Sequence, residues 1–297
     1  MHLSRALFWV VVYLGRPFGG VRPHRIAYGL WRRAFTAADF SESGYGWWRD
    51  RWGSELWLHP RYHLDFTIIA FGYYDKALHR YIDRNVSAGM TCFDIGGNIG
   101  AVSTHLARKV GKTGHVHAFE PVPALRARLE KNLARNGCEA RVTVHPLAMS
   151  DTTGEAHLSI ARVDADNQGL ASLVASGNER LTSTLTVQTA TLDDFVTARR
   201  ITRIDFIKMD IQGAEILLLE GAQRTLSTLR PDLILEVSPE DLAGIGKPSR
   251  DLLEMIEALG YRIHELRSDG TPGAQIHAHA VAPDFERENI FCTMKPG

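Results

Sequence analysis

The stretch from Cys92 to Gly100 reads CFDIGGNIG and joins a short apolar run to a turn that contains three glycines. The apolar run is typical of a strand buried on both faces, and Ile99, Val102 and Leu106 begin a pattern with helical spacing. Glycine in such a turn lets the backbone come close to a ligand or to a neighbouring element. The stretch therefore predicts a strand, a tight turn and a helix, with either a ligand or close packing at the turn.

From about Leu56 onward, strand-like and helix-like segments alternate, which is the pattern of an α/β fold. Several of the apolar runs are continuous, as in a parallel sheet that is covered on both faces. A second helical pattern contains Leu125, Leu129 and Leu133 and ends near Asn136. The predicted strands are residues 91–95, 115–120, 141–147, 204–210, 233–237, 261–266 and 290–294.

Residues 151–191 interrupt this alternation. They include GEAHLSI at 154–160, a polar stretch at 161–173 and the start of the alternating TLTVQTATL at 184–192. Alternation of apolar and polar residues is typical of half-buried strands, so we predict an antiparallel excursion from the main sheet. Thr191, with an acidic residue three positions later, is a predicted helix N-cap.

Composition limits the possible partners. At 297 residues, of which 44% are apolar, the chain is long enough for one large domain or two small ones. Lysine plus arginine equals aspartate plus glutamate, at 34 each, so no net charge attracts nucleic acid, and no nucleic-acid partner is expected. Cys92, Cys138 and Cys292 show no CxxC spacing, which favours a reduced, cytoplasmic location over a disulfide or metal framework.

The N-terminus is locally basic, unlike the chain as a whole. Six arginines precede Asp39, which is the first acidic residue of the chain. Residues 6–15, ALFWVVVYLG, are too few to span a bilayer, which takes about 20 apolar residues. They resemble the core of a signal peptide, but no small-x-small cleavage site follows. A basic segment with tryptophan predicts either peripheral contact with the inner face of a membrane or a helix packed on the domain or on a second subunit.

Glu120 ends the second predicted strand, 20 residues after Gly100. A carboxylate at this place can accept hydrogen bonds from both ribose hydroxyls of a nucleotide cofactor. The G-x-G-x-x-G motif of dinucleotide sites is not met, because Asn98 stands two residues after Gly96. Asp94 would repel a phosphate but suits the amine of S-adenosylmethionine. The residues therefore favour S-adenosylmethionine over NAD, with a purely structural turn as the alternative.

Further motifs occur in the order and spacing of the FkbM-type S-adenosylmethionine-dependent methyltransferases, which the chain resembles from about Trp57 to beyond Asn289. The resemblance implies a class I methyltransferase, with a Rossmann-like, mostly parallel sheet of seven strands and a terminal antiparallel hairpin, acting usually on a hydroxyl oxygen. Gln212 and Asp75 stand where many members have glutamate. The motifs are FDIGGNIG, HAFEPVP, AMSDTTG, TLDDF, IDFIKMDIQGAEILLLEGA, LILEV and GYYD.

The resemblance assigns contacts to the cofactor. Residues 94–98 would surround its methionine half, Glu120 would bind the ribose, and residues 148–151 would meet the adenine edge. Asp75 would approach the amine, although a helix cap for Asp75 and a turn for Asp151 fit these residues equally well. The residues assigned to the cofactor are Asp75, Asp94, Gly96, Gly97, Asn98, Glu120, Pro121, Ala148 and Asp151.

Methyl transfer to an alcohol needs a positioned acceptor and a group that takes its proton. Asp210 is the first candidate because it ends the fourth strand, beside the first. Glu215 and Glu236 are alternatives, with His145 behind them, and Glu215 also fits the first turn of a helix for electrostatic reasons alone. No Asp-Asn pair follows the fifth strand and no His/Cys cluster occurs, so we expect transfer without a metal.

Other functions stay open from the sequence alone. An NAD-dependent oxidoreductase and a catalytically silent cofactor-binding scaffold are the alternatives to an O-methyltransferase acting on a sugar, glycolipid or polyketide-like hydroxyl. We divide the chain into a basic, Trp-rich segment at residues 1–56 and the methyltransferase domain at 57–297. All six tryptophans of the chain lie in its first fifth, five of them in this segment and the sixth, Trp57, directly after it. Their crowding predicts a lid, an acceptor surface, a homo-oligomer contact or ordinary packing. The five are Trp9, Trp31, Trp47, Trp48 and Trp52.

Overall fold

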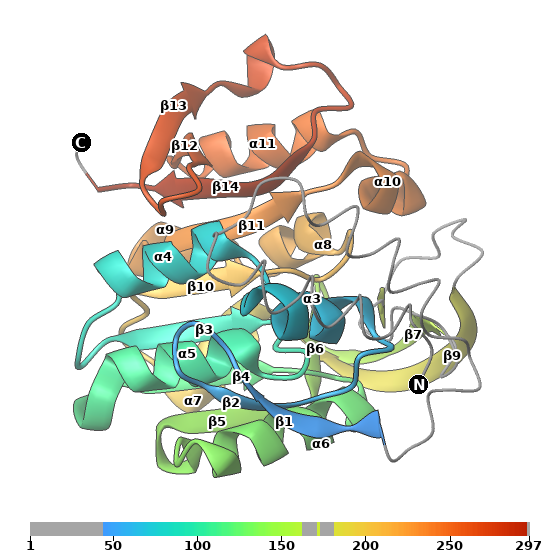
Figure 1. Cartoon of the computed structure of the whole chain (residues 1–297). Coiled ribbons are helices and arrows are strands. Elements are labelled where there is room, and N and C mark those ends of the chain that lie inside the picture. The colour runs from blue at the N-terminus through green and yellow to red at the C-terminus, as the bar shows by residue number, and fades with distance from the viewer. Residues whose placement is uncertain (1–43, 162–170, 173–180, 296–297) are drawn as a thin grey trace. The chain divides into compact units, whose positions relative to one another are not determined.

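The chain divides into two compact units, residues 1–75 and residues 76–297. The predicted division after Leu56 lies inside the first unit and stays a prediction. The computed structural model describes residues 44–161, 171–172 and 181–295 (Figure 1). The predictions for residues 1–38 lie outside these ranges. Within these ranges, no helix has the length and apolar composition that a membrane crossing needs.

The first unit contains a β-hairpin and a helix. β1 (Gly46–Arg49) pairs antiparallel with β2 (Glu55–Leu58), and Trp47 lies opposite Trp57. Trp47 is 37% exposed, whereas the leucines of β2 on the other face are buried, as expected when alternate side chains point to opposite faces. The hairpin leads to α3 (His63–Phe71).

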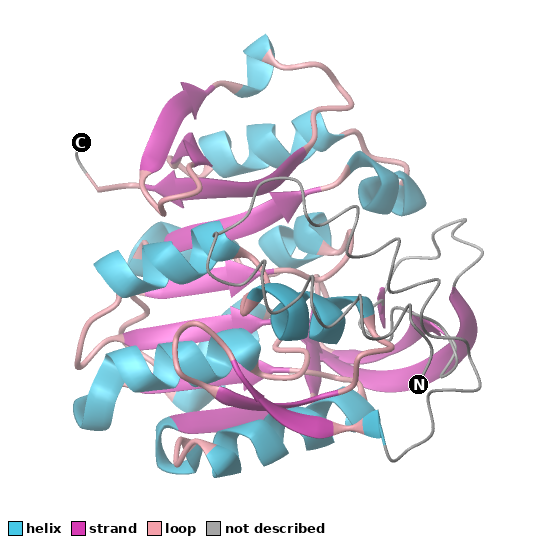
Figure 2. Cartoon of the chain, viewed as in Figure 1, coloured by secondary structure: helices cyan, strands magenta, loops and turns pink. Residues whose placement is uncertain are grey.

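The second unit is built on an eight-stranded sheet (Figures 1 and 2). Five strands are parallel to one another, and the other three run antiparallel to their neighbours. This arrangement confirms the predicted α/β fold, with a mostly parallel sheet and an antiparallel pair near the chain end. The spatial order is β13 (Pro272–Ile276), β12 (Arg262–Leu266), β14 (Arg287–Thr293), β11 (Asp232–Val237), β10 (Phe206–Met209), β3 (Thr91–Ile95), β4 (His115–Phe119) and β5 (Val142–His145).

The sheet has one strand more than the seven predicted. β13 forms an edge and pairs antiparallel with β12, with Ile276 opposite Ile263. Its sequence, PGAQI, begins with two residues that are rare inside sheets, so it carries little strand signal. The predicted strand 141–147 is in fact two, because Pro146 has no N–H to continue the ladder and β6 (Leu147–Met149) joins a different sheet.

Helices cover both faces of the eight-stranded sheet, and each face has its own apolar cluster. Alternate residues of β3 reach the two clusters, with Cys92 in one and Phe93 in the other. The predicted helices after β3 and β4 are both present. One face is covered by α4 (Lys76–Asn85), α5 (Ala101–Val110) and α6 (Pro123–Arg135), and the other by α7 (Leu192–Arg199), α8 (Glu215–Glu220), α9 (Gln223–Leu229) and α11 (Ser249–Ala258).

The predicted excursion is also present, as a separate four-stranded sheet that precedes α7. The polar stretch 161–173 lies largely outside the described residues. Thr191 is the N-cap of α7, as predicted, because its side-chain oxygen accepts a hydrogen bond from the backbone N–H of Asp194 at 2.9 Å. The strands of this sheet lie in the order β6, β9 (Leu181–Ala190), β7 (Gly154–Ala161) and β8 (Ala171–Ser172).

Candidate active site

The loops after β3, β4 and β10 meet at the carboxyl edge of the parallel strands. Ile95 is level with Phe119 on one side and with Met209 on the other, so the three loops begin side by side. In open α/β sheets, ligands bind outside this edge. Half of the twelve residues predicted for the cofactor and for catalysis lie on these loops: Gly96, Gly97, Asn98, Glu120, Pro121 and Asp210.

The glycine loop packs closely against both neighbouring strands. Gly96 has a φ of 81°, and a Cβ at this position would lie 2.0 Å from the carbonyl oxygen of Asp210. Only glycine fits there. The N–H groups of Gly96 and Gly97 donate to the carbonyl oxygen of Phe119 at 3.1 and 2.9 Å. Close packing, the alternative explanation of these glycines, is therefore part of their role.

Glu120 fastens the same loop through its carboxylate. One oxygen accepts the backbone N–H of Asn98 at 2.8 Å, and the other accepts that of Val122 at 2.9 Å. The side chain is only 4% exposed. Burial raises the pKa of Glu120 to about 7, against the effect of these two hydrogen bonds. Each carboxylate oxygen has a further lone pair, so the group can still accept the ribose hydroxyls of a cofactor.

Lys208 is a residue of this site that the sequence reasoning missed. Its Nζ donates to the carbonyl oxygen of Gly96 at 2.8 Å and lies 3.5 Å from a carboxylate oxygen of both Asp94 and Asp210. Burial disfavours its charge, but the charges of Asp210 and Asp94 outweigh burial and raise the pKa of Lys208. A lysine inside the apolar strand β10 was the available signal, because a buried lysine needs an anionic partner.

Asp94 is fully buried beneath the glycine loop. The hydroxyl of Ser103 donates to one of its oxygens at 2.5 Å, and the other oxygen faces Lys208. Burial raises the pKa of Asp94, while Lys208 and Ser103 oppose the rise. These contacts stabilise the loop from below, and the assignment of Asp94 to the methionine half stays a prediction.

Two of the three predicted catalytic carboxylates, Asp210 and Glu215, are close enough for their charges to interact. Asp210 has a side chain that is 34% exposed and accepts a hydrogen bond from Gln212 at 3.1 Å. Glu215 is 4% exposed and accepts the N–H of Ile211 at 3.1 Å. Burial first, and then the charge of Asp210, raises the pKa of Glu215 to about 7. Glu236 follows Leu235, the β11 residue that is level with Met209.

A sequence model described as the methyltransferase FkbM domain matches residues 94–263, more than half of the chain. The chain belongs to the FkbM methyltransferase family. The predicted resemblance is thereby confirmed, and so is the prediction of a methyltransferase. The family assignment supports S-adenosylmethionine as the cofactor and weighs against an oxidoreductase.

Individual relatives are more distant. The 2-O-methyltransferase NoeI of Sinorhizobium fredii is 28% identical over 173 residues, which cover 55% of this chain and 69% of NoeI. The crystal structure of an FkbM methyltransferase from Methylobacillus flagellatus is 21% identical, with a TM-score of 0.44 over 69% of this chain and only 44% of that one. An O-methyltransferase from Bacillus cereus, in complex with SAH, is 16% identical, with a TM-score of 0.44 over 74% and 80% of the two chains.

Other residues assigned by the FkbM resemblance lie around this edge. Pro121 follows Glu120 and accepts a hydrogen bond on its carbonyl oxygen from Arg126 at 3.2 Å. Ala148 is buried in β6, and Asp151 is exposed and accepts the hydroxyl of Ser150 at 2.9 Å. Their roles toward a cofactor stay predictions.

Two further candidates lie elsewhere. The imidazole of His145 is buried, 4.9 Å from the ring of Phe119 between centroids, and shares a 3.1 Å hydrogen bond with His117. Burial lowers the pKa of His145 to about 4, so it is neutral in the aromatic cluster at neutral pH. Asp75 belongs to the first compact unit, and its approach to the cofactor amine stays a prediction.

Metal-binding side chains are not clustered in the described ranges, where no group of three or more His, Cys, Asp and Glu is placed to hold a metal ion. All three cysteines are free and buried. The carboxylates of Asp94 and Asp210 lie on either side of the buried ammonium group of Lys208 at this edge.

Proposed function

We propose that this chain transfers a methyl group from S-adenosylmethionine to a hydroxyl oxygen of a sugar, glycolipid or polyketide-like acceptor. Membership of the FkbM family supports methyl transfer. The name of its relative NoeI, a 2-O-methyltransferase, supports oxygen as the atom that is methylated. The FkbM resemblance also implies a hydroxyl oxygen as the usual acceptor atom.

The glycine loop and Glu120 would hold the cofactor. The fit rests on two observations: Gly96 leaves no space for a side chain beside Asp210, and Glu120 is a buried acceptor with lone pairs to spare. The cofactor supplies a methyl group activated by the positive sulfur that carries it. The protein then has to place the acceptor in line with that methyl group and take one proton.

The observation that carries the proposal is the position of Asp210. Its carboxylate is partly exposed at the loop edge and is oriented by Gln212 and Lys208. The acceptor oxygen would attack the methyl carbon as the carbon–sulfur bond breaks, and Asp210 would accept the hydroxyl proton and pass it to water. The products are a methyl ether and S-adenosylhomocysteine.

The change Asp210→Asn tests this role, since it keeps the size of the side chain and removes the basic oxygen. We expect kcat to fall by about 10²- to 10⁴-fold, the range for a removed general base. Affinity for S-adenosylhomocysteine should be retained, because Asp210 is placed beside the acceptor. The rate is measured with labelled S-adenosylmethionine and an acceptor identified by comparing glycan and metabolite masses with and without the gene.

Asp241→Asn is the matched control, because Asp241 is a partly buried carboxylate in the short helix α10 (Pro239–Leu242) that follows β11, and it has no proposed role in proton transfer. A stable Asp210→Asn protein that binds S-adenosylhomocysteine and keeps the wild-type rate would leave Glu215 or Glu236 as the base. A wild-type protein that binds the cofactor but methylates no acceptor would instead support the scaffold alternative.

We also propose that residues 1–38 bind an anionic membrane surface. Six arginines flank an apolar segment there, and no acidic residue opposes them. Full-length protein should sediment with phosphatidylserine-containing vesicles and be released by about 0.5 M salt, whereas a chain that starts at Phe40 should not sediment. Equal behaviour of the two proteins would favour packing or an oligomer contact for this segment.

A further inference from the structure

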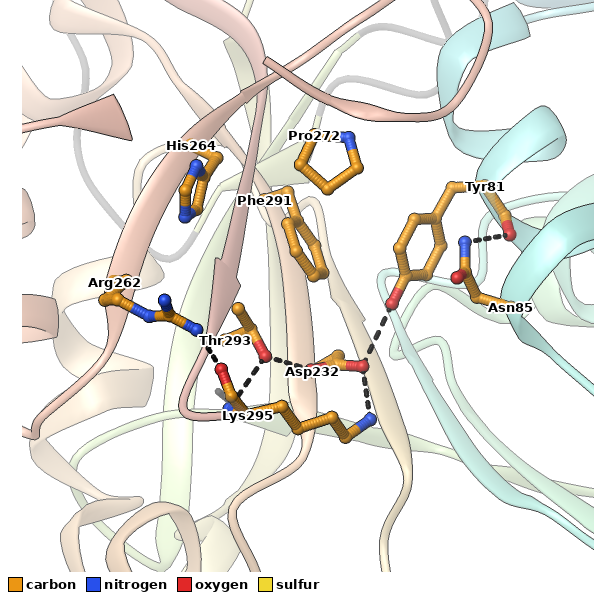
Figure 3. Close-up of a pocket in the computed structure, with 9 residues that line it drawn as sticks. All are labelled: Tyr81, Asn85, Asp232, Arg262, His264, Pro272, Phe291, Thr293 and Lys295. Atoms are coloured by element: carbon orange, nitrogen blue, oxygen red, sulfur yellow. Dashed lines mark hydrogen bonds and ion pairs between the residues drawn. The ribbon is translucent and has the colours of Figure 1, made fainter. Parts of the chain in front are cut away.

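A cavity of about 340 Å³ lies at the amino edge of the parallel strands, opposite the glycine loop (Figure 3). Its walls come from α4, from the start of β11 and from the antiparallel strands at the chain end. None of the residues predicted for the cofactor or for catalysis lines it. Its size is at the lower end of the range for small-molecule sites.

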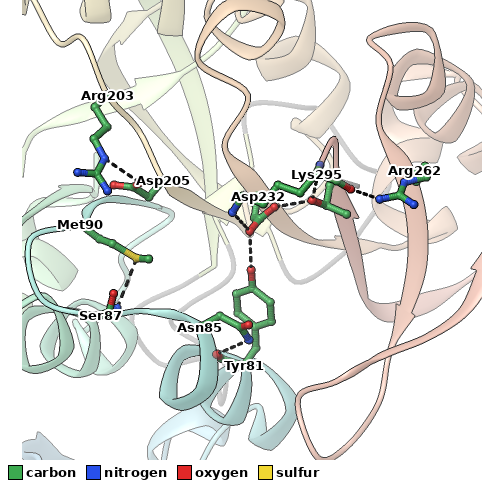
Figure 4. A network of polar contacts seen from close by, with 10 residues as sticks. Tyr81, Asn85, Ser87, Met90, Arg203, Asp205, Asp232, Arg262 and Lys295 are labelled. Atoms are coloured by element: carbon green, nitrogen blue, oxygen red, sulfur yellow. Dashed lines mark hydrogen bonds and ion pairs between the residues drawn. The ribbon is translucent and has the colours of Figure 1, made fainter. Parts of the chain in front are cut away.

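The base of the cavity is polar and internally satisfied (Figure 4). Asp232, which is 8% exposed, accepts hydrogen bonds from Thr293 at 2.6 Å, from Tyr81 at 3.2 Å and from Lys295 at 2.5 Å. Asp232 therefore neutralises the positive charge of Lys295. This carboxylate is a fixed part of the wall, and a ligand would gain little by displacing its three donors.

Arg262 is the uncompensated charge of the cavity. Its side chain donates to the backbone carbonyl oxygen of Lys295, which carries no charge (Figure 3). No acidic side chain of the described ranges forms an ion pair with it. A guanidinium group has five N–H donors in a plane, and those left over match a carboxylate or a phosphate.

The opposite half of the cavity is lined by rings. His264, Pro272 and Phe291 lie together there, on the side away from Asp232 and Lys295 (Figure 3). Phe291 is only 6% exposed and is held by the ring of Tyr81, with 5.1 Å between centroids. A flat apolar group can therefore contact these rings while an anionic group on the same molecule reaches Arg262.

We propose that this cavity is a second binding site, for a small molecule that joins one aromatic ring to one carboxylate or phosphate and is no larger than a mononucleotide. Arg262 binds the anionic group, and the half formed by His264, Pro272 and Phe291 binds the ring. The site is separate from the cofactor loop, so its occupation does not depend on methyl transfer.

Calorimetry on the full-length protein tests the site with three probes: phenyl phosphate, inorganic phosphate, which lacks the ring, and benzyl alcohol, which lacks the charge. Phenyl phosphate should bind saturably below about 10 mM, and each of the other two at least about tenfold more weakly. The titrations are repeated with S-adenosylhomocysteine at saturation, which blocks binding at the cofactor loop.

Variants then locate the binding. Arg262→Gln should weaken phenyl phosphate by about tenfold or more, whereas Arg267→Gln removes the same charge from an exposed position outside the cavity and should change the affinity by less than about twofold. Asn85→Trp fills the cavity from the exposed side of α4 and should also weaken binding. No saturable binding, or equal affinity of the Arg262→Gln and Arg267→Gln proteins, would overturn the proposal.

Discussion

The two edges of the parallel strands each hold a buried aspartate paired with a lysine, but the two pairs differ in exposure. At the carboxyl edge, the side chain of Lys208 is 8% exposed and that of Asp94 is fully buried. At the amino edge, Asp232 is buried while its partner Lys295 is 62% exposed. Water can replace Lys295 beside Asp232, whereas the surroundings of Asp94 leave no such room.

The two aspartates also differ in their hydrogen bonds, and the more deeply buried one has fewer. Asp232 has three donors, of which Lys295 is one. Among the described residues, Asp94 has one side-chain hydrogen-bond donor, Ser103. Its other oxygen has no hydrogen-bond partner there, but it lies 3.5 Å from the ammonium group of Lys208. A buried charge whose partner is removed is costly, while an exposed ion pair contributes little. The lysine of the pair is therefore essential at the carboxyl edge and nearly dispensable at the amino edge.

The largest predicted effect comes from Lys208→Met. It leaves the Asp94 carboxylate buried without a cation and should lower the free energy of unfolding by about 3–5 kcal/mol. The equivalent change at the amino edge, Lys295→Met, should cost about 1 kcal/mol or less, because Lys295 is mostly exposed. Urea denaturation of the two variants at neutral pH measures the difference.

The double variant Asp94→Asn/Lys208→Met is the control, since it removes both charges and should recover part of the stability that Lys208→Met loses. The loss should also shrink in acid. Without Lys208 the pKa of Asp94 rises further above its unfolded value, so stability is regained as Asp94 becomes protonated at low pH. Equal losses for Lys208→Met and Lys295→Met would contradict the comparison.

A second prediction concerns the hydroxyl donors of the two aspartates. Ser103→Ala removes the one hydroxyl that bonds to Asp94 in the described part of the chain. It should destabilise by about 1.5–3 kcal/mol, the range for a hydrogen bond to a charged group. Tyr81 also bonds to a carboxylate, but its bond is longer, at 3.2 Å, and Tyr81→Phe leaves Asp232 with Thr293 and Lys295, so the cost should be smaller, about 0.5–1.5 kcal/mol. Thermal unfolding of both variants gives the ranking, and a larger loss in Tyr81→Phe would reverse it.

The smallest effect concerns pH and Glu120, which titrates at the carboxyl edge. Burial raises its pKa from 4.5 to about 7, so its contribution to the stability of the cofactor-free protein is present below 4.5 and is lost as pH rises through 7. Binding needs the ionised form as an acceptor. Affinity for S-adenosylhomocysteine should therefore rise about tenfold, or ~1.4 kcal/mol, from about pH 6 to about pH 8.

Two matched variants test the origin of that pH dependence by calorimetry. Glu120→Gln should bind with an affinity that changes little over the same range. Glu215→Gln should keep the wild-type profile, although the pKa of Glu215 is also raised to about 7. A flat profile in Glu215→Gln with a steep one in Glu120→Gln would move the ribose assignment away from Glu120.

The features that the sequence by itself determined are those set by neighbours in the chain. The strand, glycine turn and helix after Cys92 are present as predicted, and Thr191 caps α7 through a residue three positions away. A helix cap, a tight turn and a hydrophobic period each depend on a few adjacent residues, so each can be predicted from a short stretch of the sequence. The order of the motifs was enough for the α/β class and for the family.

Only the tertiary structure decided which side chains meet. Lys208 bonds to Gly96 across 112 residues, and Tyr81 reaches Asp232 across 151. The register between parallel strands places such pairs together, and no local pattern encodes it. The extra strand β13 is a similar case, because its PGAQI sequence forms a strand only where β12 offers an open edge. Long-range pairing thus fixed both the buried charges of the site and the cavity at the other edge.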